Sequence, residues 1–204
     1  MIRFKSFLVF GMIALSLKVY AQNKGAETPK ALLLQSAQAM EKLDYDKIKS
    51  LYYVINEEDK KGLNALISIL KISPDIREFL KKGEGKFGSD FTEALSYGNF
   101  ILYGFSSPPD YRTAYQSAKI TIGGNRAQVL VTNKSSDGMT TSQKTLLIKA
   151  KNRWFYLSDN KEMPKVYKLL TEFITQGTII LDEAKTPEEL HDRFEKLLEL
   201  FKDF

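Results

Sequence analysis

The sequence contains no cysteine and only one histidine among its 204 residues. Without cysteine the chain has no disulfide, no thiolate metal ligand, no thiol nucleophile and no cysteine for a lipid anchor. A single histidine excludes metal sites built from several histidines. Hydrophobic residues make up 43% of the chain and charged residues 27%, which is typical of a globular protein.

The one long apolar run covers residues 7–17. As a helix it spans about 16 Å, too short for the ~30 Å hydrocarbon core of a bilayer. Arg3 and Lys5 precede the run, and the small residues Val19 and Ala21 follow it. This pattern is typical of a bacterial secretory signal peptide. We expect cleavage after Ala21, no transmembrane anchor after cleavage, and a periplasmic or extracellular location.

Charge gives little support for a nucleic-acid partner. The full chain has 30 basic and 25 acidic residues, a net charge of +5. Removal of residues 1–21 takes away three basic residues and no acid, which leaves 27 against 25 and a net charge of +2. A nucleic-acid-binding surface needs a stronger positive excess, so we expect no such partner.

Helical periodicity dominates the first half of the mature chain. Thr28 before Pro29 predicts the start of one helix, and Asp44 predicts the cap of a second that continues to Ile55. The third apolar stripe should end at Ser73-Pro74, because proline interrupts a helix. The stripes are Leu33/Ala37/Met40, Ile48/Leu51/Tyr52/Ile55 and Leu63/Leu66/Ile67/Leu70, followed by shorter predicted helices over 76–83 and 89–97.

After Pro108-Pro109 the apolar residues recur at every second position, the spacing typical of a β-strand. Alternating apolar residues predict strands over 115–122, 127–132, 142–150 and 154–157, with 100–105 as a further candidate. Short turns join them, so the strands should form an antiparallel meander. The faces expected to be buried are Ala118/Ile120/Ile122, Ala127/Val129/Val131 and Leu146/Ile148.

Helices return at the C-terminus. Pro164 opens one predicted helix, and Thr186-Pro187-Glu188-Glu189 is a well-formed start for the last. The order of helices, strands and helices predicts an α+β fold.

Two stretches resemble the NTF2-like superfamily, a cystatin-like α+β cone. Residues 40–46 resemble its first junction between helices, and the strands within 118–156 resemble its strand pattern. The resemblance implies N-terminal helices packed on a curled antiparallel sheet of four or more strands. The domains we expect are the signal peptide 1–21, an NTF2-like α+β domain 22–160, and a C-terminal helical extension 161–204 packed on the same domain.

Four aromatic residues are the candidate ligand-binding residues: Tyr52, Tyr115, Trp154 and Tyr156. If these side chains line the interior of the cone, their hydroxyl and N–H groups orient a mostly apolar ligand there. The alternative is that they only fill the core.

No catalytic residue, metal site or cofactor is expected. His191 reads as an exposed or edge-packed residue of the last helix, and no histidine occurs in 28–160 to serve the isomerases and dehydratases of the resembling superfamily. Asp110, Asp137 and Asp159 stand in turn-like contexts. The segment 83–88 is glycine-rich but lacks the Ser or Thr that follows the lysine of a phosphate-binding loop.

Three functions remain open from the sequence. The first is an exported, non-catalytic envelope protein that binds a small apolar molecule or lipid in the cone. The second is a protein-interaction module that contacts an envelope partner through its C-terminal helices. The third is an enzyme of the isomerase or dehydratase type.

Overall fold

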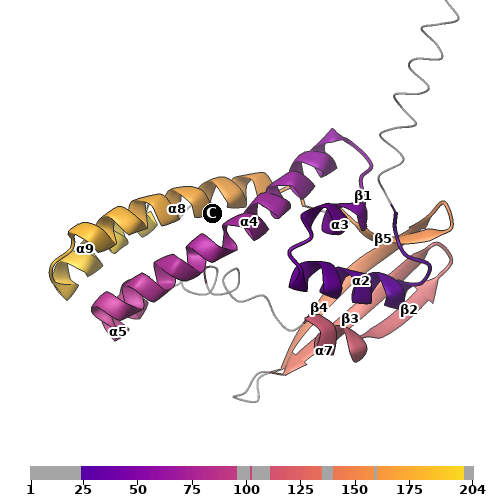
Figure 1. The fold of residues 1–204 in the computed structure, drawn as a ribbon, viewed down its shortest axis with the longest axis horizontal. Helices are drawn as coiled ribbons and strands as arrows, with labels where there is room; N and C mark the ends of the chain where they lie inside the picture. The colour runs from indigo at the N-terminus through magenta and orange to yellow at the C-terminus, as the bar shows by residue number, and fades with distance from the viewer. Residues whose placement is uncertain (1–23, 96–101, 103–110, 135–139, 159, 200–204) are drawn as a thin grey trace, which may run out of the picture. The chain divides into compact units, whose positions relative to one another are not determined.

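The computed structural model describes residues 24–95, 102, 111–134, 140–158 and 160–199 (Figure 1). The chain divides into two compact units, each built from two chain segments. The sheet unit comprises Met1–Ile55 and Asp110–Ser158, and the helical unit comprises Asn56–Pro109 and Asp159–Phe204. The elements confirm the predicted α+β class. The predicted signal peptide lies outside the described residues.

A five-stranded mixed sheet forms the centre of the sheet unit, in the order β1-β5-β4-β3-β2. Its strands are β1 (Tyr52–Tyr53), β2 (Lys119–Gly123), β3 (Arg126–Lys134), β4 (Thr140–Ala150) and β5 (Arg153–Leu157). The strands β2 to β5 pair antiparallel in chain order, which confirms the predicted meander. The sequence did not predict β1, which pairs parallel with β5.

The buried face of the sheet differs from the prediction on one strand. Ala127, Val129 and Val131 of β3 are buried as expected. On β4, however, Leu147 is buried and Leu146 is 53% exposed, so the predicted face of this strand is wrong. The pairing of Ala127 with Leu147 explains the difference, because directly opposed residues of an antiparallel pair lie on the same face. On β2, Ile122 also remains exposed.

Three helices belong to the sheet unit: α2 (Pro29–Glu41), α3 (Tyr45–Ser50) and α7 (Tyr111–Gln116). The predicted caps are confirmed: the Thr28 hydroxyl accepts from the Ala31 amide at 3.1 Å, and the Asp44 carboxylate accepts from the Lys47 amide at 2.9 Å. The second helix is shorter than predicted and ends at Ser50.

The second helix ends early because the sheet takes up the residues that follow it. The Tyr156 amide donates to the Leu51 carbonyl at 2.9 Å, and Tyr52 pairs with Tyr156. Tyrosine fits the pleated surface of a sheet well, so these pairings compete with further helix. Conversely, Tyr115, which the sequence predicted at the start of a strand, lies in α7.

One buried apolar cluster joins these helices and strands. Its buried members include Leu32 and Leu33 of α2, Val129 of β3 and Leu147 of β4. Trp154 of β5 belongs to the same cluster.

The helical unit consists of α4 (Glu57–Phe87), α5 (Ser89–Leu95), α8 (Met163–Glu183) and α9 (Pro187–Glu199). The helix α4 contacts α8, and α5 contacts α9. The start of α9 is as predicted, with the Glu189 amide donating to the Thr186 hydroxyl at 3.3 Å. Among the described residues, no helix combines the length and the apolar character needed to cross a bilayer.

The predicted break at Ser73-Pro74 is wrong, because α4 continues through Pro74. An internal proline costs a helix about 3 kcal/mol. Ile69, Ile76 and Phe79 on either side of it are almost completely buried. Burial of each such side chain contributes roughly 1.5–3 kcal/mol. Packing on both sides of the proline therefore outweighs the lost hydrogen bond.

The predicted end near Gly83 is also wrong, since α4 continues to Phe87 and Gly88 is its C-cap residue. Gly83 serves packing instead: a Cβ there would lie 2.3 Å from the ring of Phe91. Phe91 belongs to a cluster of four phenylalanine rings with Phe79, Phe173 and Phe194, whose contacting centroids lie 5.6–6.4 Å apart. The candidate strand over 100–105 lies outside the described residues except for Leu102, which is buried in this unit.

Candidate functional site

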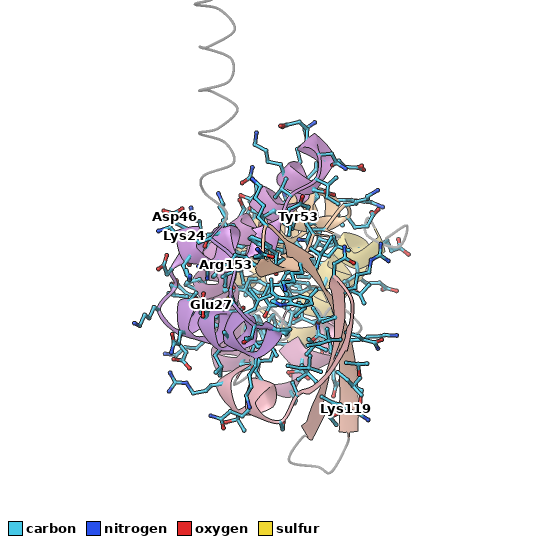
Figure 2. The ribbon with its side chains drawn as sticks, turned by 90° about the vertical axis from the view of Figure 1, so that its right-hand side faces the viewer. Lys24, Glu27, Asp46, Tyr53, Lys119 and Arg153 are labelled. Carbon is cyan, nitrogen blue, oxygen red and sulfur yellow. The ribbon has the colours of Figure 1, made fainter. Side chains whose placement is uncertain are left out.

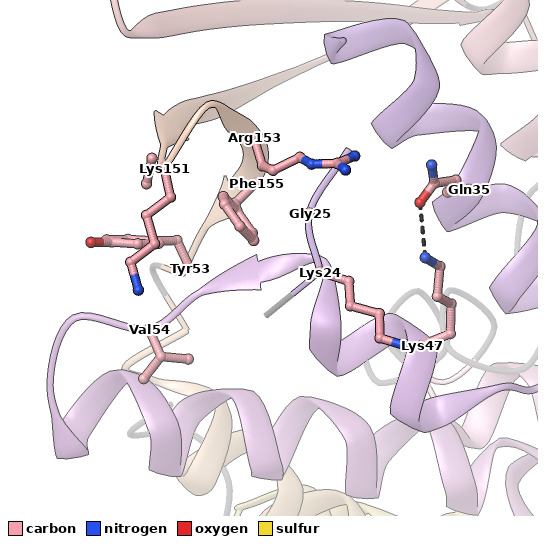
Figure 3. A pocket seen from close by; sticks show the side chains of 10 residues that line it. Lys24, Gly25, Gln35, Lys47, Tyr53, Val54, Lys151, Arg153 and Phe155 are labelled. Carbon is pink, nitrogen blue, oxygen red and sulfur yellow. Dashed lines mark hydrogen bonds between the residues drawn. The ribbon is translucent and has the colours of Figure 1, made fainter. Parts of the chain in front are cut away.

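A hollow of about 540 Å³ opens in the sheet unit (Figure 3). We call it the basic pocket, because four of its ten lining residues are cationic: Lys24, Lys47, Lys151 and Arg153. The other lining residues are Gly25, Gln35, Tyr53, Val54, Ala150 and Phe155.

The N-terminal segment is held against the sheet beside the pocket. Ala26 forms a bridge with Trp154 through two backbone hydrogen bonds of 2.9 and 2.7 Å. Gly25 lies over the ring of Phe155, where a Cβ would come within 2.6 Å of a ring carbon. Its φ of +42° is in the left-handed region, so glycine is required here for both conformation and space. This segment brings Lys24 to the pocket.

The turn between β4 and β5 forms another wall of the pocket. It carries two of the four cationic residues, Lys151 and Arg153. Lys151 and Asn152 have φ values of +48° and +60°, as a two-residue type I′ hairpin loop requires. The turn begins directly after residue 150, the end of the strand that the sequence predicted over 142–150. The turn pairs Ala150 with Arg153 and so fixes the start of β5.

Helices α2 and α3 provide the third wall. The Lys47 ammonium donates to the side-chain oxygen of Gln35 at 2.9 Å. In Figure 3 the side chain of Lys24 extends toward Lys47, the Lys47 ammonium points to Gln35, and Lys151 lies beside Tyr53. The Tyr53 and Phe155 rings, with centroids 5.7 Å apart, give the pocket an apolar portion.

The lining residues include no carboxylate and no imidazole. Near the pocket, Glu27 lies 3.5 Å from the Arg153 guanidinium, but its side chain is 80% exposed. Such a surface ion pair contributes at most about 1 kcal/mol. Four cationic side chains, with no carboxylate among the residues that line the pocket, attract an anion. The pocket therefore has the charge of an anion-binding site.

The structure brings together the four aromatic residues that the sequence singled out. Trp154 and Tyr156 are buried in the cluster of the sheet unit, and Tyr52 and Tyr115 pack against it. The Tyr52 and Tyr156 rings lie 5.2 Å apart. None of the four lines the basic pocket, which is lined by their chain neighbours Tyr53, Arg153 and Phe155.

The hydroxyl of Tyr156 is the one buried side-chain polar atom without a hydrogen-bond partner in the described part of the chain. Ser36 and Tyr115 approach it, but neither completes a hydrogen bond of good geometry. Burial raises the pKa of Tyr115 and raises the pKa of Tyr156 well above its ordinary value. Both side chains are therefore neutral phenols at physiological pH.

The other residues considered in the sequence have structural explanations or lie elsewhere. Lys86 of the glycine-rich segment donates to the carbonyls of Leu181 and Ala184 at 2.5 and 2.7 Å, so it caps the end of α8. His191 lies in the helical unit, beside two carboxylates of α5. The aspartates at 110, 137 and 159 lie outside the described residues.

The basic pocket could not be predicted from the sequence. Its cations come from three separate segments, and no local motif indicates that these segments lie close together. Comparison of the chain with protein-family models, with curated proteins and with solved structures found no match. The NTF2-like resemblance therefore stays a prediction that rests on the residues alone.

Proposed function

We propose that this is an exported, non-catalytic binding protein whose sheet unit takes up a small anionic ligand. The observation that carries the proposal is the basic pocket, with four cationic side chains and no carboxylate among its lining residues. Its volume of about 540 Å³ suits a small molecule. Export is supported by the signal-peptide pattern of residues 1–21.

The pocket favours a ligand with at least two negative charges and a short apolar portion. The Arg153 guanidinium can hold a carboxylate or phosphate through two parallel hydrogen bonds. Lys24 and Lys47 act as point charges, and the Tyr53 ring offers an apolar contact. Histidine and the carboxylates are common general acids and bases, and the pocket offers only lysine and tyrosine for that role. This lining favours binding over the isomerase or dehydratase alternative.

An apolar ligand or lipid in an NTF2-like cone remains the second proposal. It is supported by the meander, by α2 residues in the same buried cluster as the strands, and by the unpartnered Tyr156 hydroxyl. A ligand that carries one hydrogen-bonding atom would satisfy that hydroxyl. This proposal requires an opening of the aromatic cluster, whereas the basic pocket is already open.

The test uses inorganic phosphate and citrate as probes. Trp154 is the only tryptophan of the chain and lies between Arg153 and Phe155, so its emission should report binding. We expect the double variant K47Q/R153Q to weaken citrate binding at least about tenfold, the equivalent of about 1.4 kcal/mol. Binding should also weaken as salt increases.

A matched control comes from the same unit. Lys119 is an exposed cation of β2 that lies away from Lys24 and Arg153 (Figure 2). K119Q removes one positive charge without touching the pocket, so it should bind citrate like the unchanged protein. Equal loss in K119Q would show a general charge effect, and no binding of either anion would overturn the proposal.

A further inference from the structure

Three side chains that can ligate a metal ion meet in the helical unit. Asp90 and Glu93 come from α5 and His191 from α9, and one ligand atom of each lies within 4.8 Å of the others. The i, i+3 spacing places Asp90 and Glu93 on one face of α5. Asp90 and His191 are half-buried, and Glu93 is exposed, so the group is accessible from solvent.

The backbones that carry these three residues are fixed by buried neighbours. Phe91, next to Asp90, and Leu190, next to His191, are completely buried. The Phe91 ring contacts the ring of Phe194 on α9, with centroids 6.0 Å apart. The core therefore fixes the spacing of α5 and α9, and only side-chain rotations are needed to adjust the group.

We propose that Asp90, Glu93 and His191 bind one divalent transition-metal ion, with Zn²⁺ or Mn²⁺ as the best matches. One imidazole nitrogen with two carboxylate oxygens suits these ions, whereas Ca²⁺ and Mg²⁺ prefer oxygen ligands alone. At about 2.0–2.2 Å from Zn²⁺, the ligand atoms of a tetrahedral site lie about 3.4 Å apart. Small rotations from the present arrangement reach that spacing. Three protein ligands leave a coordination position for water.

The proposal replaces the expectation, drawn from the lack of cysteine and the single histidine, that the chain holds no metal. A bound ion would link α5 to α9 across about a hundred residues of sequence. It would also neutralise the two carboxylates that lie close together there. The competing explanation is a simple pairing of His191 with the carboxylates, without any ion.

Zinc titration of the chelator-treated protein tests the proposal by calorimetry. We expect one Zn²⁺ per chain, a raised melting temperature, and little or no response to Ca²⁺. Loss of an outer-shell partner of a metal site typically weakens binding 10–100-fold. H191Q and E93Q each remove a direct ligand, so each should weaken Zn²⁺ binding by at least about tenfold. E172Q removes an exposed carboxylate of α8 and should bind like the unchanged protein.

The single histidine provides a second readout. Its imidazole gives one set of nitrogen signals in an NMR spectrum, and these should shift and saturate at one equivalent of Zn²⁺. E93Q changes an exposed residue, so its fold should be intact even if H191Q folds poorly. The proposal is overturned if Zn²⁺ does not bind, if it binds H191Q and E93Q as tightly as the unchanged protein, or if it binds the unchanged protein without shifting its imidazole signals.

Discussion

Replacement of Gly25 by alanine should destabilise the sheet unit and weaken the basic pocket together. The left-handed φ of +42° costs a residue with a Cβ about 1–2 kcal/mol. The new Cβ would lie 2.6 and 2.7 Å from two carbons of the Phe155 ring and 2.9 Å from the Arg153 Cβ. Overpacking of this kind typically costs about 1–3 kcal/mol.

The cost has an upper bound, because the N-terminal segment can leave the sheet. Its release loses three backbone hydrogen bonds, two between Ala26 and Trp154 and one from the Gly25 amide to the Ser50 carbonyl, each worth about 1 kcal/mol net. It also exposes the buried Ala26 methyl, worth about 0.8 kcal/mol. We therefore expect G25A to lose about 2–4 kcal/mol in the free energy of unfolding. Phosphate binding should fall as well, since Lys24 leaves with the segment.

Urea unfolding followed by Trp154 emission measures the loss, and a phosphate titration measures binding. Gly123 provides the control in the same unit, because a Cβ there meets nothing within 4 Å and its φ is not left-handed. G123A should be as stable as the unchanged protein or up to about 1 kcal/mol more stable. A G25A protein within 0.5 kcal/mol of the unchanged one, with normal phosphate affinity, would refute the proposed seating of residues 24–26.

Three further predictions concern the sheet. In the same urea assay, L147A should lose about 2–5 kcal/mol of unfolding free energy, because Leu147 is buried. L146A should lose about 0.5 kcal/mol or less, because Leu146 is exposed. Equal losses in the two variants would contradict the assigned register. Y156F removes a buried hydroxyl without a partner, so its melting temperature should be unchanged or higher, and a marked fall would show that the hydroxyl does have a partner. Because burial raises the pKa of Tyr115 and Tyr156 in the folded state, their contribution to stability is complete below the ordinary tyrosine pKa of about 10 and is lost as pH rises beyond it. Melting temperatures measured from pH 8 to 11 should therefore fall less in Y115F/Y156F than in the unchanged protein.

Signals carried by neighbouring residues predicted the local structure well. Thr28, Asp44 and Thr186 cap the helices that the sequence placed after them, because a cap depends only on the next three residues. The same local reasoning failed at Pro74. Its cost is local, but the burial of Ile76 that offsets it depends on packing with distant parts of the chain.

The face of β4 could not be read from alternation. Leu146, Leu147 and Ile148 are three successive apolar residues, so a period of two fits either face equally well. Only the pairing with β3, which places Leu147 opposite Ala127, selects the buried one.

The two candidate sites depend on contacts that no sequence window contains. Lys47 and Arg153 reach the basic pocket from segments more than a hundred residues apart. Asp90 and Glu93 were visible as an i, i+3 pair, but their proximity to His191 follows from the packing of α5 on α9. The chain lacks a histidine or cysteine spacing motif that would have indicated the second site.

The pairing of β1 with β5 sets the order in which the chain can fold. Tyr52 finds its strand partner only at Tyr156, and Ala26 finds its own only at Trp154. During synthesis, neither pairing can form until more than three quarters of the residues have been made. Until then α2 lacks its contacts with β5. Closing so long a loop also slows folding. The sheet unit is therefore expected to complete its fold only after β5 has been synthesised.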